Sequence, residues 1–127
     1  MNKIVITNNS MSMEHFKDEY DVVFIEGTLM DVMRAARDMI HKGHRLLTHP
    51  LAGSIKPNQT PFKTIVLTLK PEPEVDLASL EYIENSMETS ERLLKNRPLR
   101  DWPETVLKDY RLIDYDLIKN ALSMNKE

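Results

Sequence analysis

The sequence contains no cysteine and only three glycines among its 127 residues. Without cysteine, the chain has no disulfide bond, no thiol nucleophile and no cysteine ligand for a metal. The glycines, at positions 27, 43 and 53, form neither of the glycine-rich phosphate-binding motifs, GxxxxGK(S/T) and GxGxxG. Thiol chemistry and the common nucleotide-binding loops are therefore excluded.

Long apolar runs and a strong net charge are also missing. No window approaches the roughly 20 apolar residues of a membrane-spanning helix. The N-terminal MNKIVITNNS lacks the long apolar run of a secretory signal. The net charge of −3 and the pI near 5.8 argue against bulk nucleic-acid binding. We therefore expect a cytoplasmic protein that binds neither a membrane nor nucleic acid.

The length and composition are typical of one folded domain. The hydrophobic fraction is 41% and the charged fraction is 29%, as in globular rather than disordered chains. A length of 127 residues is near the common domain size. We therefore expect a single α/β domain over residues 1–127.

Short β-branched and apolar segments predict four strands, over residues 3–7, 21–26, 44–49 and 63–69. A short helix is expected within 11–20, and a second begins at Thr28 in a capping-box-like arrangement with Asp31 and ends at Gly43. Residues 1–70 thus predict a βαβαββ core with a small four-stranded mixed sheet and flanking helices. The first three strands are expected to run parallel, because helices separate them, and the fourth to pair antiparallel with the third.

The C-terminal third, residues 76–124, predicts two helices. Apolar residues at helical spacing mark the first, over 76–96, and the second begins near Asp101-Glu104. Its predicted apolar stripe contains Val106, Tyr110, Ile113, Leu117 and Ala121. Packing on the core is the simpler explanation of both helices, and a dedicated partner-binding hairpin is the alternative.

Charge is unevenly distributed along the chain. From residue 39 to 71 there are five Lys or Arg residues and no Asp or Glu, so this segment carries +5 and the other residues carry −8 of the net −3. A basic segment in an acidic chain favours binding of an anion or of an acidic partner surface. Chance clustering remains the alternative.

The predicted topology places one set of polar residues together. Ligands of open α/β sheets bind beyond the carboxyl ends of the parallel strands. Residues that follow the predicted strands, together with the loop donors, are therefore our candidates for binding a small anionic ligand such as a carboxylate or phosphate. They are Asn8, Asn9, Glu26, Thr48, His49, Ser54, Lys56, Asn58 and Lys63. A loop stiffened by its three prolines, with no ligand, explains the same residues equally well.

Three of the four histidines, His41, His44 and His49, lie close together in the sequence. Their spacing disfavours a metal site, because Gly43 turns the chain after His41, and residues 44 and 49 face opposite sides of a strand. His49 is a weak catalytic candidate as an acid or base, since its ordinary pKa is near 6.5. A triad with Ser54 and Glu26 lacks the GxSxG turn. We therefore expect neither a metal nor a cofactor.

Three segments of the sequence resemble the GrdX family: ITNN at 6–9, FIEG at 24–27 and RDMIHKGHRLLTHPLAGSIKPNQTPFKTI at 37–65. The family consists of small proteins encoded beside the glycine, sarcosine and betaine reductases of anaerobic amino-acid-fermenting bacteria. The family-like positions are Thr7, Asn8, Asn9, Glu26, Arg37, Asp38, His41, His44, Thr48, His49, Pro50, Ser54, Lys56, Pro57, Asn58 and Lys63.

The resemblance implies an accessory role in selenium-dependent amino-acid metabolism, with reductase subunits as the expected partners. It assigns no catalytic residues. The lack of cysteine fits an accessory role, because this chain cannot itself carry out the thiol and selenol chemistry of such reductases. Binding of a small anion, with or without catalysis, by the rim around His49 and the 53–63 loop is the alternative.

Overall fold

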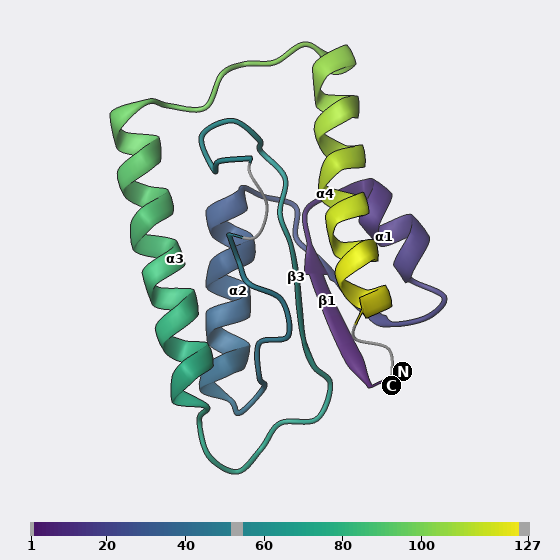
Figure 1. Ribbon diagram of the computed structural model, residues 1–127, viewed down its shortest axis with the longest axis vertical. Coiled ribbons are helices and arrows are strands. Elements are labelled where there is room, and N and C mark those ends of the chain that lie inside the picture. Colours follow the sequence, from purple (N-terminus) through teal and green to yellow (C-terminus); the bar gives the residue numbers. More distant parts are fainter. Residues whose placement is uncertain (1, 52–54, 125–127) are drawn as a thin grey trace.

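The computed structural model describes residues 2–51 and 55–124 (Figure 1). Within these ranges the chain forms three strands and four helices. In chain order they are β1 (Lys3–Thr7), α1 (Ser10–Phe16), β2 (Asp21–Phe24), α2 (Leu29–His41), β3 (Thr64–Thr68), α3 (Leu77–Asn96) and α4 (Glu104–Met124). None of the helices in the described part of the chain is long and apolar enough to cross a membrane.

The sheet has the strand order β2-β1-β3. β1 pairs parallel with β2 and antiparallel with β3, so the predicted α/β class and mixed sheet are confirmed. In this register Thr7 at the end of β1 lies between Phe24 at the end of β2 and Thr64 at the start of β3. Three chain segments therefore meet at one end of the sheet.

Side-chain alternation along the strands builds a core on each face of the sheet. Ile4 and Ile6 of β1, with Ile65 and Leu67 of β3, pack against α2 and α3. On the other face, Val5 and Val66 pack against α1 and α4. Figure 1 shows the resulting three layers, with α2 and α3 on one side of the strands and α1 and α4 on the other.

The predicted strand over residues 44–49, the third along the chain, is wrong: in the described residues the sheet has three strands, and this segment contributes only an isolated antiparallel bridge between Leu46 and Leu67. It runs beside β3, and two ladder-type backbone bonds form, Leu47 N–H to Val66 O and Thr68 N–H to Arg45 O. The pattern HRLLTH is locally indistinguishable from a strand, which is why the sequence predicted one.

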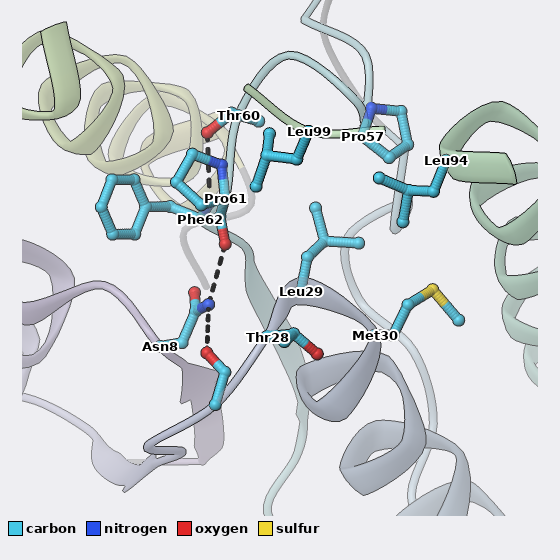
Figure 2. Close-up of a pocket in the computed structure, with 11 residues that line it drawn as sticks. Asn8, Thr28, Leu29, Met30, Pro57, Thr60, Pro61, Phe62, Leu94 and Leu99 are labelled. Atoms are coloured by element: carbon cyan, nitrogen blue, oxygen red, sulfur yellow. Dashed lines mark hydrogen bonds between the residues drawn. The ribbon is translucent and has the colours of Figure 1, made fainter. Parts of the chain in front are cut away.

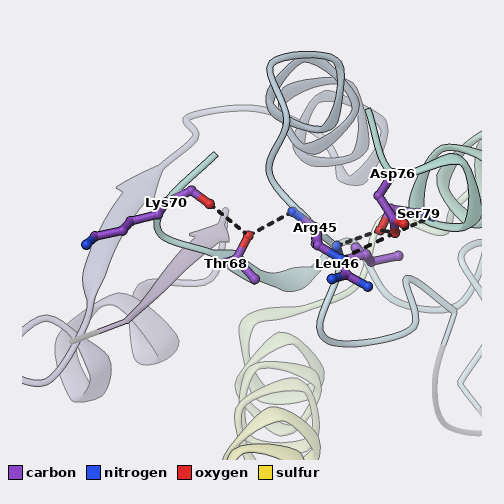
Figure 3. A network of polar contacts seen from close by, with 6 residues as sticks. All are labelled: Arg45, Leu46, Thr68, Lys70, Asp76 and Ser79. Carbon is purple, nitrogen blue, oxygen red and sulfur yellow. Dashed lines mark hydrogen bonds and ion pairs between the residues drawn. The ribbon is translucent and has the colours of Figure 1, made fainter. Parts of the chain in front are cut away.

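Side-chain hydroxyls replace the other ladder bonds of this segment. Arg45 N–H donates to Thr68 Oγ1 at 2.8 Å, and Val66 N–H donates to Thr48 Oγ1 at 3.0 Å. Leu46 N–H donates to Ser79 Oγ in the first turn of α3 (Figure 3). Because these amides are satisfied by hydroxyls, the segment follows the sheet edge without completing a ladder.

The predicted helix ends are confirmed at both ends of α2. Thr28 Oγ1 accepts from Asp31 N–H, and Asp31 Oδ2 accepts from Thr28 N–H, which completes the capping box. At the other end, Gly43 has φ of 109°, a conformation that residues with a Cβ rarely adopt.

Replacing Gly43 with alanine should destabilise the fold, because a Cβ at this position is strained by the positive φ and meets the carbonyl oxygen of Glu72. We expect a loss of about 1–3 kcal/mol in the free energy of unfolding, measured by urea denaturation. Gly27→Ala is the matched control. Its Cβ meets the side chain of Asp31, which would have to shift and weaken the capping box, but the backbone at Gly27 has no positive φ. A smaller loss is therefore expected, and a loss as large as that of Gly43→Ala would contradict the explanation.

Candidate functional site

The carboxyl ends of β1 and β2 and the start of β3 form the polar rim that the sequence singled out. Of the candidate residues, Asn8, Asn9 and Lys63 lie at this end of the sheet. Each of the three side chains contacts neighbouring residues, and these contacts determine whether it is available to bind a ligand.

The Asn8 carboxamide joins three segments of the chain. Its Nδ2 donates to Gly27 O at 3.1 Å, between β2 and α2, and to Pro61 O at 2.9 Å, before β3. Its Oδ1 accepts from Lys63 N–H at 2.9 Å. Both amide hydrogens and the carbonyl oxygen are thus used inside the protein. Asn8 therefore fixes the shape of the rim, with its carboxamide occupied by these contacts.

Asn9 ties the same end of the sheet to two helices. Its Oδ1 accepts from Met11 N–H and caps α1, while its Nδ2 donates to Arg111 O and to Asp114 Oδ2 on α4, each at 2.9 Å. The side chain is fully buried. Asn9 thus places α1 and α4 against each other on one face of the sheet.

Asp114 is the centre of a buried polar cluster that the sequence did not predict. Its Oδ2 lies 2.6 Å from Thr64 Oγ1, which is also 2.7 Å from Thr7 Oγ1 and 3.0 Å from Ser12 Oγ. Burial raises the pKa of the Asp114 carboxyl, and donation from Thr64 and Asn9 opposes that rise. The cluster connects the sheet to α1 and α4 by hydrogen bonds.

Lys63 lies immediately before β3 and is only 8% exposed. Burial lowers the pKa of its ammonium group, and the nearby charge of Asp114 partly offsets this effect. Among the described residues, Lys63 has no ion pair within 4.0 Å. A buried lysine whose pKa is lowered in this way is a poor point charge for an anion in solvent.

A cavity of about 340 Å³ opens beside this rim (Figure 2). Asn8 and Thr28 lie on one side of it, and Thr60, Pro61 and Phe62 on another. The rest of its lining is mostly apolar: Gly27, Leu29, Met30, Pro57, Leu94 and Leu99. Its position agrees with the general rule for ligand sites in α/β sheets. Its chemistry differs from the anion site that the sequence suggested.

The other candidate residues have various environments. Thr48 is buried and bonded to Val66, and His49 is exposed with its ring 5.4 Å from that of Tyr82 on α3. Glu26 and Lys56 are exposed. Asn58 donates to Leu93 O at the end of α3, close to the cavity. Ser54 lies outside the described residues, so its place in the site stays a prediction.

The histidines form no cluster with other metal-ligating residues in the described part of the chain. His44 Nδ1 lies 2.7 Å from Thr68 O, and His49 Nδ1 accepts from Leu51 N–H. His41 is exposed at the end of α2. Each ring thus belongs to a different local contact.

Asp114 was not among the predicted site residues, because the predicted apolar stripe of the last helix is wrong at Ile113. Ile113, which the stripe included, is 45% exposed, whereas Asp114, Ile118 and Leu122 face the protein. The sequence does contain a signal for its orientation. Asp114 lies four residues before Ile118 and eight before Leu122, a spacing that places all three on one face of a helix. Its hydrogen-bond partners lie 50 or more positions away, so sequence spacing did not reveal them.

Comparison with known proteins gives one family match. The model of the family described as GrdX-like protein matches residues 4–123, nearly the whole chain. No curated protein and no solved structure matches the chain.

The raised pKa of Asp114 predicts a definite pH dependence. The folded protein binds this proton more tightly than the unfolded chain does. The group's contribution to stability is therefore present at low pH and is lost as the pH rises from the unfolded pKa, near 3.8, through the folded pKa. Asp114→Asn stays neutral and keeps an acceptor oxygen. The stability of this variant relative to the wild type should therefore increase as the pH is raised from the unfolded pKa toward neutrality.

The control for this prediction is Asp114→Ala, which removes the acceptor for Thr64 and one acceptor for Asn9. Because it also lacks the titrating carboxyl, it should follow the same pH trend but stay about 1–3 kcal/mol less stable than Asp114→Asn, measured by urea denaturation. If the stability of Asp114→Asn relative to the wild type does not increase with pH, the explanation by burial is wrong.

Proposed function

The chain belongs to the GrdX-like family, and from this premise we propose that it is an accessory protein of the glycine, sarcosine or betaine reductase system. The family match over residues 4–123 carries the proposal. In this role the chain contacts a reductase component and assists its assembly, maturation or regulation, while the reductase performs the chemistry.

The residue types of the chain and their contacts support a role without catalysis. Reductive cleavage by such reductases uses thiols and selenols, and this sequence contains no cysteine. The polar groups at the usual ligand-binding end of the sheet are used within the fold. Asn8 bonds to the loop between β2 and α2 and to the chain before β3, Asn9 caps a helix, and Asp114 is buried among hydroxyls. These contacts favour a rigid surface over a reactive centre.

The alternative, a binding site for a small anion around His49 and the 53–63 loop, has less support. His49 packs against Tyr82, while Lys63 is buried within electrostatic reach of Asp114. Lys56 is exposed, and its backbone N–H donates to Gln59 Oε1. The three cationic candidates of the sequence thus have separate environments.

Direct binding to purified reductase components tests the accessory role. The tagged chain is immobilised, and each component is passed over it in biolayer interferometry up to about 100 µM, where a contact of about −5.5 kcal/mol is half-saturated. We expect saturable binding of at least one component. A tagged acidic protein of similar size serves as the control for nonspecific attraction. If every component gives only the control signal, the proposed role is wrong.

A further inference from the structure

The cavity beside Asn8 is bounded on its outer side by the end of α3 and the linker to α4. Leu94 comes from the last turns of α3 and Leu99 from the linker, and Figure 2 shows both side chains pointing toward Leu29 of α2. Trp102 Nε1–H donates to Gln59 O at 2.8 Å, which connects the linker to the loop before β3. The volume of about 340 Å³ is near the lower limit of ordinary ligand sites, so the cavity admits a short apolar group.

The same chain segment that supplies Leu94 and Leu99 is strongly basic. Between residues 92 and 100 there are four cationic side chains and no Asp or Glu, so the segment carries +4. All four are exposed, and in the described part of the chain none of them takes part in an ion pair. They are Arg92, Lys95, Arg97 and Arg100. Lys56, which is also exposed, precedes the cavity-lining Pro57.

The positive charge is confined to residues 92–100 of this part of the chain. The preceding turns of α3 are acidic, with Glu81, Glu84, Glu88 and Glu91 and no Lys or Arg from 81 to 91. The basic part of α3 is therefore confined to the end that borders the cavity. Glu91 and Asp101 flank the segment, but in the described residues none of its four cations forms an ion pair within 4.0 Å. An apolar cavity bordered by a segment of charge +4 is complementary to an apolar group flanked by carboxylates.

We propose that the cavity and residues 92–100, together called the basic rim site, bind an acidic segment of a partner protein through one large apolar side chain. The apolar side chain enters between Leu29, Leu94 and Leu99, and neighbouring carboxylates contact the cations of the segment. A polypeptide fits better than a small anion because the cations are spread along nine residues. The cavity lining itself contains no Lys or Arg.

This inference rests on the proposed function in one respect, that the occupant is a polypeptide. The family match identifies no docking surface, and the geometry of the basic rim site supplies one. Leu99 is 37% exposed and lines the cavity, so its side chain is accessible to an incoming apolar group.

Fluorescence anisotropy with synthetic peptides tests the basic rim site. The probe is a fluorescein-labelled peptide of glutamates around one phenylalanine, and its matched control has alanine in place of the phenylalanine. We expect saturable binding of the phenylalanine peptide that weakens with added salt, and binding of the alanine peptide about tenfold weaker. Equal binding of both peptides, or none at millimolar concentration, would overturn the proposal.

Variants of exposed residues locate the site. Arg97→Glu with Arg100→Glu should weaken the phenylalanine peptide at least tenfold, and Leu99→Ser should weaken it without changing the salt dependence. The matched control is Lys17→Glu with Lys119→Glu, which makes the same change of charge on α1 and α4 and should bind as the wild type does. Thermal unfolding of each variant checks that it is folded. Wild-type binding by the Arg97/Arg100 variant would show that the site lies elsewhere.

Two further measurements separate the possible occupants. If octanoate saturates the wild type and the peptide does not, the cavity takes a small molecule and the proposal is wrong. If sedimentation shows self-association that the Arg97→Glu, Arg100→Glu variant abolishes and peptide binding is absent, the occupant is a second copy.

Reductase binding by the wild type and equally by this variant would overturn the basic rim site and leave the accessory role intact.

Discussion

The arrangement of the whole rim depends on two neighbouring carboxamides at the end of β1. Asn8 bonds to the loop between β2 and α2 and to the chain just before β3. Asn9 caps α1 and bonds to α4. A parallel and an antiparallel neighbour bring the required segments to the same place, and the two side chains then hold them there.

These hydrogen bonds change the role that we assign to the polar residues at the rim. Their type and position suggest a ligand-binding site, yet most of their hydrogen-bonding capacity is used in the fold. Asp114 and Lys63 are buried charges whose environments disfavour ionisation, which is opposite to what an exposed anion site needs. What stays accessible is an apolar cavity and the cations next to it. The accessible chemistry is thus suited to contact with another molecule, which is what the proposed accessory role requires.

Local patterns predicted the elements that are held together by local forces. β-branched runs identified β1 and β3, and Thr28, Asp31 and Gly43 marked the ends of α2. The topology rule also brought Asn8, Asn9 and Lys63 to one end of the sheet. The predictions that were wrong depend on contacts between residues that are far apart in the sequence. Hydroxyls of Thr48, Thr68 and Ser79 take over bonds that would have made residues 44–49 a strand. Likewise, Asp114 bonds to Asn9, which lies between β1 and α1, and to Thr64 of β3, and neither spacing nor composition encodes these partners.

Residue-resolved hydrogen exchange tests the central claim, that each asparagine holds its own set of segments. In Asn8→Ala the amide of Lys63 loses its acceptor and should exchange about tenfold faster, while the amide of Met11 keeps its wild-type protection. In Asn9→Ala the effect should be reversed, with Met11 faster and Lys63 unchanged. If neither amide responds, or if both respond equally in both variants, the carboxamides do not act as separate ties and the account of the rim is wrong.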